Sequence, residues 1–280
     1  MTFSFFKYEG LGNDFLIAEQ GHGPEVTPEL AAQLCDRHFG VGGDGVLMTG
    51  FKQGSPFMKV INADGSVPEM CGNGLRCVAL YLVHRGLLKE RTFTVETDAG
   101  PHPVAVFPEG RVGQVRVSMR PASLDSSEVL SDGRGEFLDA SFPVDGRELR
   151  VSAVSMGNPH AVIFDEIGDD APHLGPRIEK DPRFRAGANV GFARMRDRST
   201  IELKVWERGV GFTLACGTGA CAAAVAAVET GRADRDSTLT VHLPGGPLYI
   251  RVGQRGERIE MTGPAREVFS GGTLLHSGDR

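Results

Sequence analysis

The sequence predicts an α+β fold made of two pseudo-symmetric halves, each a mixed or antiparallel sheet wrapped around a central apolar helix. Three observations support this prediction. The two halves of the 280-residue chain match each other in sequence. Short apolar strands alternate with isolated helices in both halves. Two segments, "LRCVALYLVHRG" and "ACAAAVAAVETG", are apolar nearly all round, as expected of a helix that a sheet encloses.

A constant offset relates the two halves. Cys71 and Cys216 are 216 − 71 = 145 residues apart, and Gly12 and Gly157 are 157 − 12 = 145 residues apart. At this offset "MKVINADGSVPEMCGNG" aligns without gaps on "LKVWERGVGFTLACGTG". Farther along the chain the register slips by one residue. Several matches in one register are improbable by chance, so we expect an internal duplication.

Both halves have the same expected order of elements. A strand, a Gly-Asn turn and a second strand are followed by a helix, which in the first half has Thr27 as N-cap, Pro28 as first residue and Gly40 after its end. Next come a strand ("FMKVIN", "IELKVWE"), a Cys-Gly turn, the apolar helix and a β-rich tail ("TFTVETDAGPHPVAVF", "STLTVHLPGGPLYIRV"). The polar residues 121–150 are expected to hold the connection between the halves.

The expected domain boundaries follow from the duplication. The first half is expected to contain residues 1–117 and 263–280 and to carry Cys71. The second half is expected to contain residues 118–262 and to carry Cys216.

The composition excludes several classes of protein. The net charge of −6 argues against nucleic acid as a partner. The first fifteen residues lack the order of a signal peptide, and the longest apolar run, 220–228, is too short to span a membrane. Five cysteines without a C-x-x-C pair favour a reducing, cytoplasmic location with free thiols.

The cysteines divide into two groups. Cys35, Cys77 and Cys221 lie in apolar helical segments and are interpreted as core residues. The spacings 71 to 77 and 216 to 221 do not match a zinc site, so no metal is expected. Cys71 and Cys216 instead lie at the expected N-termini of the two apolar helices, each within a repeated Cys-Gly-x-Gly motif.

A helix N-terminus presents unpaired N–H groups and about half a positive charge. It therefore binds anions, and it lowers the pKa of a cysteine placed there. Glycines let the backbone approach a ligand closely. Two such thiols on pseudo-symmetric halves suit inversion at a carbon next to a carboxylate. One thiol would remove the α-proton, the other would return a proton to the opposite face, and the helix ends would stabilise the developing charge. No lysine stands near these motifs in a cofactor-like context, so no pyridoxal cofactor is expected.

The motifs resemble those of a known family. "GLGNDF", "NADGSVPEMCGNGLRC", "SMGNPH", "ANVGF" and "ERGVGFTLACGTGACAA" are together similar to diaminopimelate epimerase, over nearly the whole chain except 121–150. The resemblance implies a cofactor-independent interconversion of LL- and meso-diaminopimelate, on the route to lysine and peptidoglycan, in a cytoplasmic enzyme and possible homodimer. It implies Cys71 and Cys216 as the acid/base thiols and His160 as a possible supporting residue. The residues that it implies for substrate binding are Asn13, Asn62, Gly72, Asn73, Asn158, Asn189, Glu207, Arg208, Gly217 and Thr218.

The chemistry of these side chains agrees with that implication. The far end of the substrate is a second amino acid. Arg208 offers a planar fork for its carboxylate, and Glu207 and the asparagine oxygens can accept from its ammonium group. Two positions depart from the family pattern. Phe212 stands where family members often have Glu, and Gly45 stands where some have Gln, so Gly45 is left outside the expected site.

Three alternatives remain open from the residues. A racemase or epimerase of proline or hydroxyproline has similar Cys-Gly-x-Gly pairs and would have little need for Arg208. A thiol redox protein would pair Cys71 with Cys216 in a functional disulfide. An anion-binding module would keep its ligand affinity after either cysteine is replaced.

Overall fold

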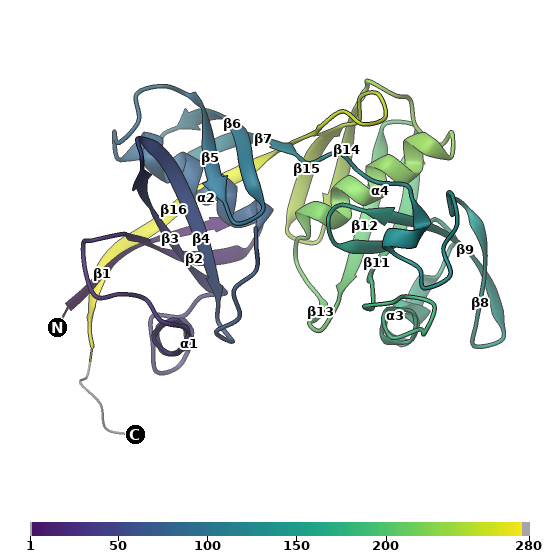
Figure 1. Ribbon diagram of the computed structural model, residues 1–280, viewed down its shortest axis with the longest axis horizontal. Helices are drawn as coiled ribbons and strands as arrows, with labels where there is room; N and C mark the ends of the chain where they lie inside the picture. The colour runs from purple at the N-terminus through teal and green to yellow at the C-terminus, as the bar shows by residue number, and fades with distance from the viewer. Residues whose placement is uncertain (1, 276–280) are drawn as a thin grey trace. The chain divides into compact units, whose positions relative to one another are not determined.

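The computed structural model describes residues 2–275, which form two compact units. The first unit contains residues 2–117 and 263–275, and the second contains residues 118–262. The chain therefore passes from one unit to the other twice, at 117–118 and at 262–263. Each unit combines a sheet with few helices, so the predicted α+β class is confirmed (Figure 1).

The sheet of the first unit closes on itself. Its strands follow the order β1-β2-β3-β4-β5-β6-β7-β16, and β16 also pairs with β1. The pairs β2–β3 and β4–β5 are parallel, whereas β1–β2, β3–β4, β5–β6 and β6–β7 are antiparallel. The strands are β1 (Thr2–Gly10), β2 (Asn13–Glu19), β3 (Gly45–Lys52), β4 (Ser55–Asn62), β5 (Thr92–Thr97), β6 (Gly100–Glu109), β7 (Val112–Met119) and β16 (Ile259–Leu274), whose first residues belong to the second unit.

Helix α1 (Pro28–Cys35) begins where the sequence predicts. Thr27 is its N-cap, the N–H of Leu30 donates to the Thr27 hydroxyl at 3.3 Å, and Pro28 is the first residue. The helix ends earlier than the glycine suggested. A carboxylate oxygen of Asp36, the C-cap, accepts from the N–H groups of two following residues and turns the chain.

Helix α2 (Gly72–His84) belongs to the first unit. It packs against β1, β2, β3, β4 and β6. Residues 74–82 are buried, which explains why the segment is apolar on every side. Its interior includes one charged side chain, the completely buried Arg76.

The sheet of the second unit repeats the strand pairing of the first. Its strands follow the order β15-β14-β12-β11-β10-β9-β8, with β13 paired to β12 and the start of β16 paired to β15. Its parallel pairs, β10–β11 and β12–β14, correspond in order to β2–β3 and β4–β5. The strands are β8 (Ala140–Val144), β9 (Arg147–Ser155), β10 (Pro159–Ile163), β11 (Asn189–Asp197), β12 (Thr200–Glu207), β13 (Gly211–Phe212), β14 (Thr238–Leu243) and β15 (Gly246–Arg251).

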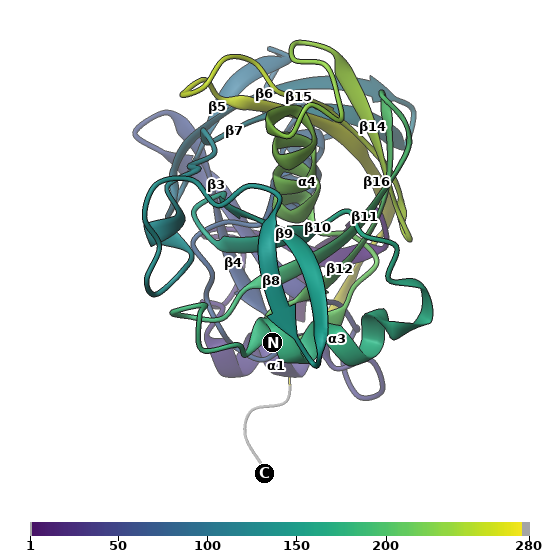
Figure 2. The same cartoon turned by 90° about the vertical axis from the view of Figure 1, so that its right-hand side faces the viewer.

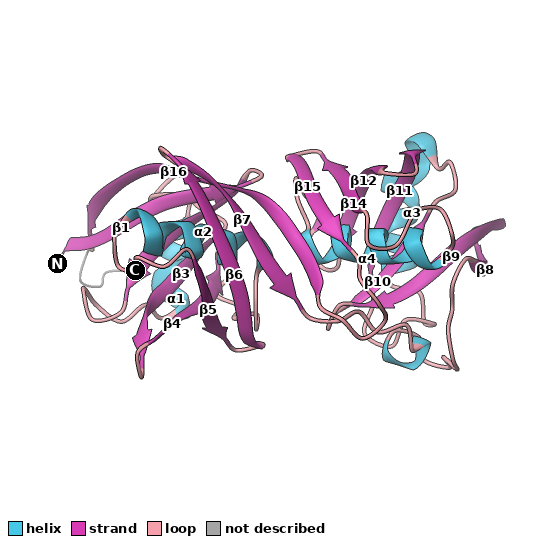
Figure 3. Cartoon of the chain, turned by 90° about the horizontal axis from the view of Figure 1, so that it is seen from above, coloured by secondary structure: helices cyan, strands magenta, loops and turns pink. Residues whose placement is uncertain are grey.

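Helix α4 (Gly217–Glu229) is the counterpart of α2. Its bounds are those of α2 shifted by 217 − 72 = 145 and 229 − 84 = 145 residues. It packs against β9, β10, β11, β12, β14 and β15, the strands drawn beside it in Figures 2 and 3. Residues 219–228 are all buried. The second unit also has α3 (Ala171–Glu179) and two short 3₁₀ helices, η1 (Ser126–Glu128) and η2 (Gly168–Asp170).

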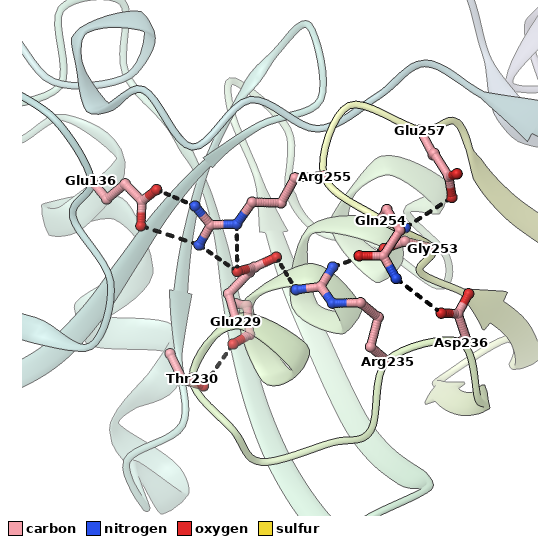
Figure 4. Close-up of polar contacts among 10 residues, drawn as sticks. Glu136, Glu229, Thr230, Arg235, Asp236, Gly253, Gln254, Arg255 and Glu257 are labelled. Atoms are coloured by element: carbon pink, nitrogen blue, oxygen red, sulfur yellow. Dashed lines mark hydrogen bonds and ion pairs between the residues drawn. The ribbon is translucent and has the colours of Figure 1, made fainter.

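A cluster of charges stabilises the C-terminal end of α4. A carboxylate is unfavourable at the negative end of a helix, yet Glu229 stands there with a side chain only 5% exposed. Arg235 and Arg255 both donate to it, and Arg255 also donates to Glu136 (Figure 4). The cluster lines a cavity of about 470 Å³, and Val225, Val252 and Ile259 also line it.

One expectation about the connection is wrong. Residues 121–150 do not lie between the units; they belong to the second unit and contain η1, β8 and the start of β9. Ser123 bridges to Ser155 at the end of β9, which anchors the start of this segment to the sheet. Polar, glycine-rich composition suggested a linker, but the segment contains strand β8, which forms a hairpin with β9. Within residues 2–275, no helix has the length and apolar character that a membrane crossing requires.

Candidate active site

Cys71 is the N-cap of α2. Its backbone is extended (φ −135°, ψ 116°), and its sulfur accepts a hydrogen bond from the N–H of Gly74 at 3.4 Å. The thiol thus occupies the place where serine or aspartate usually caps a helix. A Cβ on Gly74 would lie 2.9 Å from a methyl carbon of Leu47, so glycine is needed for this close approach. The side chain of Cys71 is partly exposed.

An amide pair lies beside Cys71. The side-chain N–H of Asn73 donates to Asn13 Oδ1 at 3.1 Å, and the Cys71 sulfur is 3.9 Å from the same oxygen. Asn13 Nδ2 in turn donates to a carboxylate oxygen of Asp44 at 2.7 Å. Asp44 also contacts Arg37, which is paired with Asp14. The structure therefore brings together four of the five residues predicted in this unit: Asn13, Cys71, Gly72 and Asn73.

Asn62 lies at the end of β4, opposite Gly45 in the β3–β4 pairing. Its side chain donates to Ser66 at 2.9 Å, and no hydrogen bond given for it joins the residues around Cys71. The backbone conformation at Gly45 explains the missing side chain there. A Cβ would lie 2.8 Å from the carbonyl oxygen of Ile61, so a glutamine would require the neighbouring strand to shift.

Cys216 caps α4 in the same way. Its backbone is extended (φ −122°, ψ 106°), and its sulfur accepts from the N–H of Gly219 at 3.3 Å. The sulfur lies 3.6 Å from the Thr218 hydroxyl, which accepts from Asn158 Nδ2 at 3.3 Å. Asn158 Oδ1 then contacts His160 Nε2 at 3.1 Å. Five predicted residues, Cys216, Gly217, Thr218, Asn158 and His160, are thus connected.

His160 is a neutral imidazole at physiological pH. It is 1% exposed, and burial together with the nearby Arg208 guanidinium lowers its pKa to about 3. Because an amide oxygen only accepts, the proton of the neutral ring is on Nε2. His160 pairs with Asn189 between β10 and β11, and the Asn189 side chain accepts from the backbone N–H of Arg208 at 3.0 Å. The guanidinium of the exposed Arg208 also donates to the carbonyl oxygen of Ala186 at 2.6 Å.

Glu207 connects this group of residues to Cys216. Burial raises the pKa of the Glu207 carboxyl, while hydrogen bonds from Thr213 and Cys216 act in the opposite direction. The side chain of Phe212 has no polar group that could form a hydrogen bond with this carboxyl. Its ring packs edge-on against Trp206, with centroids 5.2 Å apart, and the departure from Glu therefore adds apolar packing at β13.

The remaining cysteines have the core positions that the sequence predicted. Cys35 is 3% exposed, and Cys77 and Cys221 are 0% exposed. Burial raises the pKa of Cys35 to about 11 and also raises that of Cys77, which favours the neutral thiol. Among residues 2–275, no group of three or more His, Cys, Asp and Glu side chains is placed to hold a metal ion.

Three residues contact the predicted site although sequence reasoning did not select them. Asp44 orients Asn13, Thr213 donates to Glu207, and Arg76 donates to Asn73. The signal for Arg76 was present, because it is the one charged side chain within the apolar run "LRCVALYL". Thr213 had no such signal in the sequence. Its contact with Glu207 forms only because the chain between β13 and α4 brings the two side chains together.

The fold is that of amino-acid epimerases and racemases. A solved structure of a hydroxyproline epimerase from Agrobacterium vitis, with bound trans-4-hydroxy-L-proline, superposes with a TM-score of 0.66 at 16% identity, covering 97% of this chain and 91% of that chain. The family model described as diaminopimelate epimerase matches residues 5–124 and 152–268. The chain belongs to the diaminopimelate epimerase family.

Full-length relatives support this assignment. "Diaminopimelate epimerase 1" of Nostoc sp. is 43% identical over 97% of this chain and 99% of its own length. Diaminopimelate epimerase of Pelotomaculum thermopropionicum is 46% identical over 95% of this chain and 97% of its own length. The prediction of an isomerase of the epimerase type is confirmed.

Proposed function

We propose that this protein interconverts LL- and meso-diaminopimelate, a reaction of lysine and peptidoglycan biosynthesis, by two-base proton transfer without a cofactor. Membership of the diaminopimelate epimerase family supports the substrate. The observation that carries the mechanism is the repeated cap: in each unit a cysteine sulfur caps a buried helix and accepts from the third amide of that helix.

The reaction needs two acid/base groups at one carbon, and each unit offers one thiol. The thiolate of one cysteine removes the α-proton, and the electron pair passes into the adjacent carboxylate. The thiol of the other cysteine then gives its proton to the opposite face, so one S–H bond forms and another breaks. No electrons are gained or lost. In the reverse direction the two cysteines exchange roles.

The reacting carboxylate is proposed to bind at the two helix starts. The first amides of an α-helix cannot be paired within the helix, and their partial positive charge favours an anion. Gly72 with Asn73 and Gly217 with Thr218 provide these amides. Stabilisation of the developing negative charge by such oriented groups does the work that a cofactor would otherwise do.

The second amino-acid group of the substrate is proposed to bind the remaining polar residues. The Arg208 guanidinium suits a carboxylate, and the half-buried Glu207 with amide oxygens suits an ammonium group. A site built from such polar groups favours a ligand that pairs with them over one that leaves them unpaired once it covers them. The proposed set is Asn13, Asn62, Asn158, Asn189, Glu207 and Arg208, with His160 orienting Asn158 through its hydrogen bond.

We propose an internal duplication as the origin of this symmetry, with a sheet wrapped around a central helix in each unit. The shared 145-residue offset of α2 and α4 and the repeated pattern of parallel strand pairs support it.

The test is turnover of LL-diaminopimelate in deuterated water. Solvent deuterium should enter one α-carbon only, with both isomers formed. Cys71→Ser and Cys216→Ser should each reduce kcat by several orders of magnitude, whereas Cys35→Ala, a control in the core, should retain activity. Full activity in either serine variant would exclude two-thiol proton transfer.

Substrate specificity is tested on the same enzyme. Arg208→Ala should raise KM for diaminopimelate while both thiols stay reactive toward alkylating agents. L-Proline and trans-4-hydroxy-L-proline should not be turned over. Turnover of either imino acid at a rate similar to that of diaminopimelate would instead favour the proline-type alternative.

A further inference from the structure

Arg76 has an unusual position for a cation. It is the fifth residue of the apolar helix α2, is 0% exposed, and is the largest fully buried side chain among the described residues. Burial of a guanidinium is costly unless its N–H groups are hydrogen-bonded. Such a residue is expected to have a role that an apolar side chain could not fill.

The guanidinium joins three elements of the first unit. Its Nε donates to the carbonyl oxygen of Pro264 on β16 at 3.1 Å, and its Nη2 donates to Asn73 Oδ1 at 2.9 Å. A longer contact of 3.4 Å reaches the carbonyl oxygen of Gly72. A Cβ on Gly10, at the end of β1, would lie 3.2 Å from Nη2, so the glycine leaves room for the guanidinium. These three acceptors are neutral oxygens.

Arg76 determines the orientation of the amides beside Cys71. Arginine only donates, so Asn73 must turn its oxygen toward Arg76 and its NH₂ toward Asn13. Asn13 must then offer its oxygen to Asn73 and its NH₂ to the carboxylate of Asp44, as observed. The donor Arg76 and the acceptor Asp44, at opposite ends of this chain of hydrogen bonds, thus fix the orientation of both amides. The Asn13 oxygen is in this way held next to the Cys71 sulfur.

The charge of Arg76 also acts on a buried thiol beside it. Its guanidinium lowers the pKa of Cys77, its neighbour in sequence, against the larger opposing effect of burial. Arg76 lies five residues after Cys71 on the same helix, so its charge adds to the positive helix end at which Cys71 stands. The Asn13 oxygen opposes the thiolate, but at 3.9 Å it is farther from the sulfur than the Gly74 nitrogen at 3.4 Å.

The other charged groups of this region are paired with one another. Glu9 on β1 is paired with Arg266 on β16. Asp14 on β2 is paired with Lys7 of β1 and with Arg37, and Asp44, just before β3, also contacts Arg37. Exposed Glu69 lies two residues before Cys71. The carboxylates of Glu9 and Asp14 still raise the pKa of the neighbouring Cys77, and the cation of Arg76 is the charge that opposes them there.

The second unit has no equivalent cation. The 145-residue offset places Cys221 of α4 where Arg76 lies in α2, and Cys221 is a buried core residue. Cys216 instead forms a hydrogen bond with the Glu207 carboxyl. The two helix-capping thiols therefore have different electrostatic surroundings, although their caps have the same geometry.

We propose that Arg76 is a positioning residue: it fixes the Asn73–Asn13 amide pair beside Cys71 and favours the thiolate form of that cysteine over that of Cys216. The importance of this role for turnover rests on the proposed epimerase function. The effect on the thiol itself does not, and it is measured separately.

The experiment compares two variants of Arg76. Arg76→Met removes both the positive charge and the hydrogen-bond donors. Arg76→Lys keeps the charge but loses the planar arrangement of guanidinium N–H groups. Alkylation of Cys71 and Cys216 by iodoacetamide is followed against pH in each variant, with each site quantified by peptide mass spectrometry. Cys216 is the internal control. Turnover of LL-diaminopimelate is measured on the same preparations.

In Arg76→Met, the pH midpoint for alkylation of Cys71 should rise by about one unit, because loss of a nearby opposite charge typically shifts a pKa by about 1–3 units. The midpoint of Cys216 should not change. kcat should fall at least about tenfold, the factor that one pKa unit represents, with a smaller change in KM. In Arg76→Lys, the Cys71 midpoint should stay near that of the parent while kcat still falls, because the amide pair is no longer fixed.

An unchanged Cys71 midpoint in Arg76→Met, or an equal shift at both cysteines, would overturn the proposal. If Arg76→Met does not fold, Arg76→Lys decides: parental kcat in that variant would overturn the positioning role. If the parent protein does not epimerise diaminopimelate, the proposed function fails, while the alkylation midpoints still test the effect of Arg76 on Cys71.

Discussion

Burial of His160 predicts a specific loss of stability in mild acid. The imidazole is 1% exposed, and burial with the nearby Arg208 lowers its pKa from 6.5 to about 3. The unfolded chain therefore binds a proton below pH 6.5 that the folded protein does not bind until about pH 3. Since the unfolded state binds more protons in this interval, stability must decrease as the pH falls through it.

The size of the effect follows from the two pKa values. The proton-binding term destabilises the folded state by RT ln[(1 + 10^(pKU − pH))/(1 + 10^(pKN − pH))], where U and N are the unfolded and native states. With values of 6.5 and about 3, this is about 0.1 kcal/mol at pH 7.5 and about 2 kcal/mol at pH 5. Replacement of His160 by Gln, which cannot titrate, should remove this part of the pH dependence.

The assay is urea unfolding at pH 7.5 and pH 5.0, followed by fluorescence of Trp206, the single tryptophan, which lies in the same unit as His160. The parent should lose about 2 kcal/mol more between the two pH values than His160→Gln does. His38→Gln, at an exposed position, is the control and should behave as the parent does. Equal losses in the parent and in His160→Gln would refute the argument.

Three further changes test other parts of the structure. Gly219→Ala would place a Cβ 2.9 Å from a methyl carbon of Val205, and this overpacking should cost about 1–3 kcal/mol in urea unfolding; an unchanged midpoint would contradict the close packing seen here. Thr27→Ala removes the cap of α1 and should cost about 1 kcal/mol, whereas Thr27→Ser should cost much less; equal losses would show that the cap does not stabilise the helix. Arg255→Gln leaves the buried Glu229 with one partner fewer and should cost about 1–2 kcal/mol, measured by urea unfolding at low and high salt; no loss at either salt would mean that Arg235 alone is sufficient.

The apolar helices were the most predictable part of the fold. Helices α2 and α4 have their N-caps at the predicted Cys-Gly turns, because a helix start depends on local capping and glycine chemistry. Thr27 was a correct N-cap for the same reason. The end of α1 was placed too late, since Asp36 caps the following turn with its own carboxylate before Gly40 is reached.

Contacts over long sequence distances were not predictable. The sequence indicated that Asn13 and Asn73 belonged to one site, but it did not indicate that Asp44 fixes one amide and Arg76 the other. These contacts depend on which strands become neighbours. The segment 121–150 was misread for a different reason: its strand β8 forms a local hairpin with β9, and Ser123 and Leu130 bridge to Ser155 and Phe184, which polar composition does not reveal.

The sequence by itself determined the α+β class, the repeated Cys-Gly helix starts and the family, because each depends on local residue patterns or on their recurrence at one offset. Only the tertiary structure decided the surroundings of the two thiols. A buried arginine stands on the helix that Cys71 caps, and the half-buried Glu207 carboxyl contacts Cys216. The physical reason is that electrostatic effects on a thiol depend on distance and burial, and both are fixed only when the strands and helices of each unit pack together.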